Sequence, residues 1–551
     1  MTMASGEANR LSLRDMIIVV AFALVALAPG ISWLPPMDRD ESRYAVASAQ
    51  MQASGDYVDI RFQDKPRYLQ PAGIYWLQSA SASLFDARDE IWAYRLPSLL
   101  GALAAVLMTA WAGTALFGRN VGIAAGLMLA ASFSLNFEAR TAKTDAALLA
   151  SIAAAQFALL RVYLNQERTR GWAALFWAAL GVGMMLKGPI IVMIAGATIL
   201  ALIIWDRRAG WLKGLHAGWG ALLFLAIVLP WYVAIGFESD GEFYARAVGV
   251  SLLGKVGHAQ QSHAGPPGYH LGLFPFAFWP ASLFAALAIP FVWRKRREPA
   301  VRFMIAWIVP TWVIFEAIAT KLPHYVLPTY PALACLGAAA LFLPDDAKPT
   351  RVGAVARALW IAIWVAASAG VAGLGPVALS QLAGRIDAAT IGASVIVFAL
   401  AMAALVFTLQ KRAWRAVACA AAAGALAWVN VFANVAPRLE RIWISPRLEA
   451  AVRAAAPCPQ PVLTTNPFIE PSLVFLHGSA ATKLAETPEE AVAAFAGAGE
   501  CAVAAIGAAQ KEAFVAGLAA RGIAVREAGI VRGQNYSNGD ALELTLYVAA
   551  R

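Results

Sequence analysis

Apolar stretches separated by short polar segments recur from residue 16 to residue 435 of this 551-residue chain. A helix needs about 20 residues to cross the hydrocarbon layer of a membrane, and each stretch is close to that length. We therefore predict thirteen membrane spans, near residues 16–34, 96–117, 120–136, 146–164, 171–187, 189–205, 217–237, 272–293, 301–319, 325–343, 356–378, 388–409 and 413–435. The first span is too long for a cleaved signal peptide, so we expect it to stay in the membrane.

The short polar segments carry their Lys and Arg residues on one side of the predicted membrane. With a cytoplasmic N-terminus, alternation of the spans places every strongly basic short loop in the cytoplasm, as the positive-inside rule expects. The loops at 35–95 and 238–271 and the tail after residue 436 then lie on the opposite face.

The pattern changes after residue 436, where short apolar runs predict strand, helix, strand, helix, strand. The expected fold is therefore an α-helical polytopic membrane domain at 1–436, followed by a small soluble α/β domain at 437–551. Cys458 and Cys501 lie in this second domain, where they could form a disulfide outside the cytoplasm. Their spacing alone does not show whether they meet.

Composition supports a membrane protein. Hydrophobic residues make up 60% of the chain and charged residues 14%, and the mean hydropathy is +0.61. These values exclude a single water-soluble core. The net charge of +10 lies mostly in the short loops, so we expect contact with membrane lipids and not with nucleic acid.

The loop at 35–95 carries an acidic pair, Asp40 and Glu41, in the run PPMDRDESRYA. Its apolar positions predict amphipathic helices along the membrane surface, where a site can reach lipid-linked substrates. An acidic pair beside Arg43 would need partners if it were partly buried. We interpret the pair as part of a site, whereas Asp38, Asp56 and Asp59 are better explained as solvated loop residues.

Other ionisable groups stand at the outer ends of later spans. They are Glu138, Arg140, Lys143 and Asp145 in FEARTAKTDAALLA, Lys187 in MMLKGP, and Lys321, His324 and Tyr325 in TKLPHYVLPTYP. Charges at a membrane edge are costly and usually functional. Asp145 could instead favour a helix N-terminus, and Lys187 could simply extend to the interface.

Four motifs together resemble a known family: DESRYA after the first span, an aspartate opening the fourth, KGP after the fifth, and TKLPHYVLPTYP before the tenth. They are similar to the polyprenyl-phosphate-sugar glycosyltransferases of the GT-C class, specifically the lipid A aminoarabinose transferases (ArnT-like) and the related protein mannosyltransferases. The resemblance implies an inverting enzyme of the bacterial inner membrane with its site on the periplasmic face. It would move aminoarabinose, a uronic acid or a hexose from a polyprenyl phosphate to lipid A or a related acceptor.

The resemblance also implies roles for residues. Asp40 would receive the acceptor's proton, Asp145 would orient the acceptor or the sugar, and Glu41 would support Arg43. A phosphodiester leaving group needs cations to absorb its charge. The expected substrate-binding residues are Glu41, Arg43, Tyr44, Lys65, Arg67, Tyr68, Gln70, Lys187, Lys255, Lys321, His324 and Tyr325.

The chain departs from the family pattern at two places. Gln70 stands where the family often has a lysine, so Lys65 or Arg67 would complete the phosphate site. In SLLGKVGHAQQSHAGPPGYH, Lys255 would replace an arginine, and the three histidines lack clear ligand spacing. We assign no cofactor and leave the metal unknown; a divalent metal is the less favoured alternative.

Two alternatives to lipid A transfer remain open. A protein mannosyltransferase-like enzyme would keep the donor and use protein hydroxyls as acceptors. A transporter or flippase would carry a similar lipid without chemistry, but the paired halves with broken spans that are typical of transporters are not evident.

Overall fold

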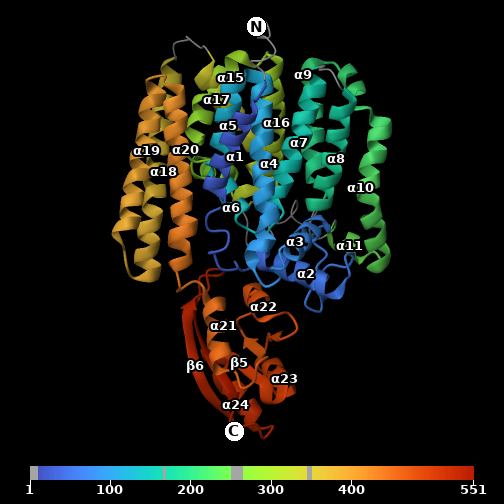
Figure 1. Cartoon of the computed structure of the whole chain (residues 1–551), viewed down its shortest axis with the longest axis vertical. Coiled ribbons are helices and arrows are strands. Elements are labelled where there is room, and N and C mark those ends of the chain that lie inside the picture. Colours follow the sequence, from blue (N-terminus) through green and yellow to red (C-terminus); the bar gives the residue numbers. More distant parts are fainter. Residues whose placement is uncertain (1–9, 165–168, 248, 250–264, 344–349, 551) are drawn as a thin grey trace.

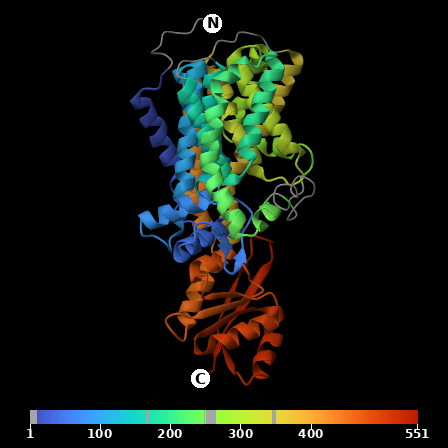
Figure 2. The same cartoon turned by 90° about the vertical axis from the view of Figure 1, so that its right-hand side faces the viewer.

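The computed structural model describes residues 10–164, 169–247, 249, 265–343 and 350–550. A bundle of long helices makes up most of the chain, and a smaller domain with a β-sheet lies at one end of it (Figure 1). Helices α2 (Asp40–Ser54) and α3 (Gly73–Leu84) lie between the bundle and this domain, as the perpendicular view also shows (Figure 2).

The helices of the bundle follow the predicted spans. They are α1 (Leu13–Leu27), α4 (Ile91–Phe117), α5 (Arg119–Ala130), α6 (Phe133–Ala139), α7 (Asp145–Tyr163), α8 (Thr169–Lys187), α9 (Ile190–Asp206), α10 (Ala217–Glu238), α11 (Glu242–Tyr244), α13 (Tyr269–Ala277), α14 (Ser282–Leu287), α15 (Ile289–Lys295), α16 (Pro299–Ala317), α17 (Tyr330–Phe342), α18 (Arg351–Ala383), α19 (Ala388–Leu409) and α20 (Ala413–Val429), with the 3₁₀ segments η1 (Gly210–Leu215) and η3 (Pro323–Thr329).

Two of the predicted spans are broken. Helices α5 and α6 meet at a bend of 63°, and the segment near 272–293 is divided into α13, α14 and α15. In the second of these segments, Pro280 lies between α13 and α14 and Pro290 lies at the beginning of α15, and proline cannot donate the backbone hydrogen bond that would continue a helix. Among the described residues, eight helices are long and apolar enough to cross a membrane, or up to nine if α5 and α6 form one span. The chain is a multi-span membrane protein, and the count of thirteen stays a prediction.

Two glycines allow close approaches near the first loop, residues 35–95. A Cβ atom on Gly101 of α4 would lie 2.6 Å from the Cα atom of Ala147 in α7. A Cβ atom on Gly73 of α3 would lie 2.6 Å from the backbone oxygen of Met185 in α8. Only glycine fits such short approaches. The first approach brings the beginning of α7 against α4, and the second brings the end of α8 against α3 of the first loop.

The C-terminal domain contains a five-stranded sheet, as the sequence predicted in outline. Its strands are β3 (Val462–Asn466), β4 (Thr482–Leu484), β5 (Ala502–Gly507), β6 (Val525–Gln534) and β7 (Ala541–Ala549), and its helices are α21 (Ile444–Ala455), α22 (Pro471–His477), α23 (Pro488–Ala498) and α24 (Lys511–Ala519). The strand order is β4-β3-β5-β7-β6, with β4, β3 and β5 parallel and the last two pairings antiparallel.

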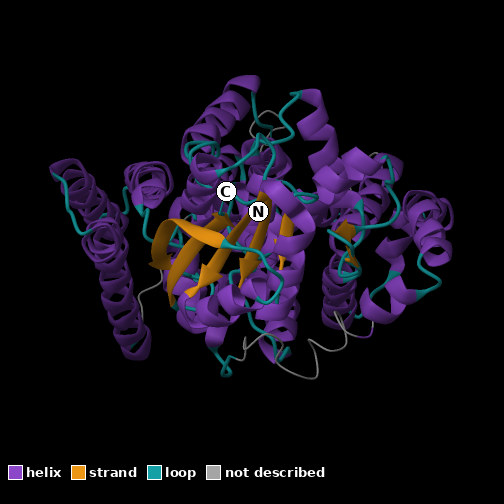
Figure 3. Ribbon diagram, turned by 90° about the horizontal axis from the view of Figure 1, so that it is seen from below, coloured by secondary structure: helices purple, strands orange, loops and turns teal. Residues whose placement is uncertain are grey.

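The sheet of this domain has helices on both faces (Figure 3). Val503 and Ala505 of β5 pack with α21 and α22, whereas Ala502, Ala504 and Ile506 pack with α23 and α24. This alternation follows from the two-residue period of a strand. Both faces of β5 are therefore buried.

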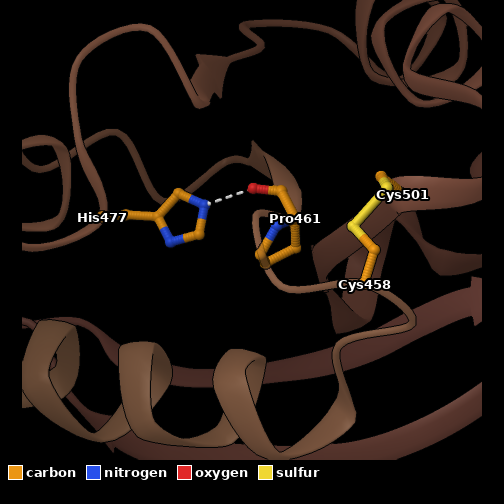
Figure 4. Close-up of a disulfide and its surroundings, with 4 residues drawn as sticks. All are labelled: Cys458, Pro461, His477 and Cys501. Atoms are coloured by element: carbon orange, nitrogen blue, oxygen red, sulfur yellow. Dashed lines mark hydrogen bonds between the residues drawn. A yellow bond between two sulfur atoms is a disulfide. The ribbon is translucent and has the colours of Figure 1, made fainter.

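Cys458 and Cys501 form a disulfide, with Cα atoms 5.5 Å apart (Figure 4). The pairing that the sequence left open is thus present. The ring of His477 lies nearby, with Nδ1 2.7 Å from Glu449 and Nε2 3.0 Å from the backbone oxygen of Pro461. The crosslink joins residues 43 positions apart in the sequence.

Candidate active site

Asp40 is the first residue of α2, and its side chain is exposed. The start of a helix favours a carboxylate, because unpaired backbone N–H groups there carry partial positive charge. The charge of Asp40 acts on Arg43 and Arg67 of the same loop, and also on Lys143 and His324 from other segments. Asp40 is therefore close enough to both groups of charges for its own charge to act on each of them.

Glu41 is buried in an ion pair. Its carboxylate accepts two hydrogen bonds from the Arg95 guanidinium, at 2.7 and 2.8 Å, and one from each backbone N–H of Met37 and Ala142, both at 2.8 Å. Arg95 also donates to the backbone oxygens of residues 31, 34 and 35. The structure thus gives Glu41 a different partner from the expected Arg43, because a buried carboxylate requires a full set of donors.

Arg43, Tyr44, Arg67 and Gln70 form a cluster with Tyr75. The Arg67 guanidinium lies 5.0 Å from the centroid of the Tyr44 ring, which is 5.3 Å from that of Tyr75. The Tyr44 hydroxyl donates to Gln70 Oε1, and burial raises the pKa of Tyr44 well above its usual value, so it stays a neutral donor. Burial and the positive charge of Arg67 lower the pKa of Arg43. An anionic ligand such as phosphate would stabilise both cations.

A second cluster joins residues from four segments. Lys187 Nζ, at the end of α8, lies 2.5 Å from Asp145 Oδ1 at the beginning of α7. The ring of His324, in η3, lies 3.5 Å from Asp145 on one side and 3.5 Å from Glu138 on the other. Glu138 is in turn 3.0 Å from Lys143 Nζ. The fold thereby connects three of the motifs that stand far apart in the sequence.

A cavity of about 270 Å³ lies where the two clusters meet, and we call it the rim cavity. Its ionisable and amide side chains include Gln70, Asp145, Lys187, His324 and Tyr325. Most of the remaining wall is apolar: Leu69, Pro71, Leu148, Leu149, Met184, Gly188, Pro189, Ile190, Met193, Tyr232, Phe243, Tyr244, Ala247, Phe315, Ile318, Leu327 and Pro328. A charged end beside an apolar wall suits an amphipathic ligand with an anionic head. Arg43 borders a different and larger cavity, of about 1320 Å³, between the first loop and the C-terminal domain.

Comparisons with known proteins identify similar chains. The family described as dolichyl-phosphate-mannose-protein mannosyltransferase matches residues 12–240. An undecaprenyl phosphate-alpha-4-amino-4-deoxy-L-arabinose arabinosyl transferase from Yersinia pestis (strain Pestoides F) is 28% identical over 354 residues, which are 62% of this chain and 61% of the relative. A relative of the same description from Pseudomonas fluorescens (strain Pf0-1) is 26% identical over 321 residues, covering 56% of this chain and 54% of the relative. Each match spans less than two thirds of the relative.

Solved structures cover nearly the whole chain. A crystal structure of ArnT from Cupriavidus metallidurans bound to undecaprenyl phosphate matches 97% of this chain and 98% of its own, with a TM-score of 0.74 and 20% identity. The chain has the fold of this ArnT structure. The apo form of the same ArnT gives a TM-score of 0.72 at 21% identity, over 96% of this chain and 97% of its own. The resemblance inferred from the motifs is confirmed.

Eight of the described predicted residues do not line the rim cavity: Asp40, Glu41, Arg43, Tyr44, Lys65, Arg67, Tyr68 and Lys321. Three of these make their contacts elsewhere. The side chain of Lys65 is 85% exposed and lies 4.0 Å from Glu486 of the C-terminal domain. The Tyr68 hydroxyl donates to Asp59 at 2.7 Å, and Lys321 is buried and donates to a backbone oxygen three residues earlier. Of the two cations expected to compensate for Gln70, Arg67 lies in the cluster with Arg43 and Tyr44, whereas Lys65 does not.

Lys255, His258 and His263 lie outside the described residues. His270 is buried, with Nδ1 3.0 Å from Glu316 Oε2. Within the described part of the chain, no group of three or more His, Cys, Asp and Glu side chains is arranged to hold a metal ion.

Sequence reasoning missed Arg95 and misjudged Arg140. Arg95 is a single cation in the first turns of an apolar helix, and such residues normally have a specific partner. That signal could have identified it. Arg140, which the sequence grouped with Asp145, instead donates to the backbone oxygens of residues 26, 29 and 136. These hydrogen bonds hold the end of α6 against the end of α1.

Proposed function

We propose that the chain transfers aminoarabinose from undecaprenyl phosphate to lipid A on the periplasmic face of a bacterial inner membrane. The observation that carries this proposal is the rim cavity, in which Lys187 and Asp145 stand beside an apolar wall and next to the Arg43 and Arg67 cluster. The descriptions of the relatives support the donor and the sugar. A uronic acid or a hexose is the alternative sugar.

The reaction is a displacement at the anomeric carbon, C1, of the donor. An acceptor oxygen forms the new bond to C1 while the bond from C1 to the phosphate oxygen breaks, and the phosphate leaves with the electron pair. Asp40 receives the acceptor's proton as general base. Arg43 and Arg67 stabilise the charge that develops on the leaving phosphate. Asp145, held by Lys187, orients the acceptor or the sugar, and a single displacement inverts C1.

Transfer to protein hydroxyls is the second candidate. The match of residues 12–240 to the protein mannosyltransferase family favours it. Donor binding and the role of Asp40 would be the same, since only the acceptor differs.

Mass spectrometry of lipid A and of protein glycans tests the proposal. Cells lacking the gene are complemented with the wild-type chain, with Asp40→Asn, or with Asp64→Asn, which changes an exposed aspartate of the same loop. We expect the sugar on lipid A to depend on the wild-type gene, to be lost with Asp40→Asn and to be kept with Asp64→Asn.

Three other results would change the conclusion. Sugar on proteins, with unmodified lipid A, would establish the second candidate. Unchanged lipid A and proteins in every strain would contradict sugar transfer altogether. Movement of labelled polyprenyl-phosphate lipid across vesicles by the purified chain, without sugar transfer, would indicate a flippase.

A further inference from the structure

The turn that precedes Asp40 is bonded to the C-terminal domain. The backbone N–H of Asp38 donates to the hydroxyl oxygen of Tyr536 at 2.6 Å. Tyr536 lies between β6 and β7, about 500 residues later in the sequence. The Ser472 hydroxyl, in the first turn of α22, donates to the Asp38 carboxylate. Two separate elements of the C-terminal domain therefore hold one residue of the first loop.

Arg39, directly before Asp40, is held in the same way and has an unusual backbone conformation. Its φ is 62°, in a region that residues with a side chain rarely adopt. Its guanidinium donates to the backbone oxygen of Ser537. On the other side of the turn, the backbone N–H of Met37 donates to Glu41. A strained residue persists where its surroundings fix it, and here the membrane domain and the C-terminal domain both do so.

The groups that hold the turn are themselves fixed. The Tyr536 ring packs edge-on against Trp443, with centroids 5.7 Å apart. The Trp443 indole N–H donates to the backbone oxygen of Ala436, close to the end of the last membrane helix. The Ser472 hydroxyl also lies 2.6 Å from that of Ser445. Tyr536 and Ser472 are thus rigidly placed, as a positioning function requires.

We propose that Tyr536 and Ser472 are positioning residues for sugar transfer. They hold the turn at 37–39 so that the Asp40 carboxylate is correctly directed, and the C-terminal domain thereby sets the catalytic rate. Both residues bond to Asp38, two positions before Asp40, and neither lines the rim cavity, so each acts through Asp40 and not on the donor. The proposal rests on the proposed function. Loosening the turn should lower kcat and leave KM for the donor nearly unchanged.

The first test measures hydrogen exchange over residues 36–43 in the purified full chain. Tyr536→Phe removes one oxygen and keeps the ring against Trp443. Ser537→Ala is the matched control, because the Ser537 hydroxyl has no hydrogen-bond partner among the described residues and the backbone oxygen that binds Arg39 remains. We expect faster exchange in Tyr536→Phe and wild-type exchange in Ser537→Ala.

The second test measures sugar transfer by the same proteins. We expect Tyr536→Phe to lower kcat about threefold to tenfold, with KM for the donor changed by less than about twofold. Ser472→Ala removes the hydroxyl of α22 that bonds to Asp38. Like Tyr536→Phe, it should speed hydrogen exchange and lower kcat. Ser537→Ala should keep the wild-type kcat.

The outcomes separate this proposal from the proposed function. If Asp40→Asn abolishes transfer but Tyr536→Phe and Ser472→Ala keep wild-type exchange and kcat, positioning is overturned and the proposed function stands. A rise in KM with unchanged kcat would also overturn it. If the wild-type chain transfers no sugar, the proposed function fails and the catalytic role falls with it, while exchange still shows whether Tyr536 holds the turn.

Discussion

The buried pair of Glu41 and Arg95 allows a quantitative prediction, since both side chains are at most 1% exposed. Replacing Arg95 by Met leaves the Glu41 carboxylate buried without its cation and removes three further hydrogen bonds to backbone oxygens. Breaking a buried ion pair by removing one partner costs about 3–5 kcal/mol. We expect Arg95→Met to lower the free energy of unfolding by at least this amount.

A double-mutant cycle and a surface control make the test specific. The variant with both Glu41→Gln and Arg95→Met carries no charge at this pair. Its loss of unfolding free energy should therefore be smaller than the sum of the two single losses by about 2 kcal/mol. Arg532→Met breaks the exposed pair with Glu543, whose loss should change the free energy of unfolding far less than loss of the buried pair. The assay is reversible unfolding of the purified chain in mixed micelles, followed by tryptophan fluorescence. If Arg95→Met cost no more than Arg532→Met, the reasoning about this pair would be refuted.

Three further predictions concern other contacts. Lys187→Met removes the cation beside Asp145 at the rim cavity and should lower kcat/KM about 100-fold, with partial recovery in Lys187→Arg; wild-type turnover in Lys187→Met would contradict this. Burial and a nearby carboxylate raise the pKa of Asp38 from 3.8 to about 7. Between these two pH values the folded chain binds a proton that the unfolded chain has lost. The free energy of unfolding should therefore fall as the pH rises from about 4 to about 7 and then stay level. Unfolding midpoints across this range should show a smaller slope for Asp38→Asn, and equal slopes would exclude the assignment. Cys458→Ser should cost about 2–4 kcal/mol by opening the link to Cys501, and thermal unfolding of this variant, unlike that of the wild-type chain, should not respond to reductant.

The sequence predicted the helices and strands better than it predicted which side chains contact one another. Asp145 and Lys187 were identifiable because each places a charge at the end of an apolar helix, but their ion pair joins positions 42 residues apart and depends on how α7 and α8 pack. Glu41 was correctly expected to need a partner. The sequence suggested the neighbouring Arg43, whereas the fold supplies Arg95, 54 residues away.

Contacts between the two domains could not be predicted from the pattern of polar and apolar residues. Asp38 was interpreted as a solvated loop residue, because nothing near it in the sequence indicates burial. Its partners Ser472 and Tyr536 come from a domain more than 400 residues later. Local patterns reveal which residues are charged and which are apolar, but they do not reveal which distant surface covers them. The broken span near Pro280 could be predicted from the sequence, because a proline is itself a local signal that a helix is interrupted.

The most direct test of the account is transfer by the purified chain from undecaprenyl phosphate aminoarabinose to lipid A, with donor binding measured on the same samples. We predict that the wild-type chain forms modified lipid A, and that Asp40→Asn binds the donor with unchanged affinity but turns over at least about 100-fold more slowly, as expected for loss of a general base. Wild-type turnover in Asp40→Asn, with normal folding and donor binding, would contradict the central role assigned to this carboxylate.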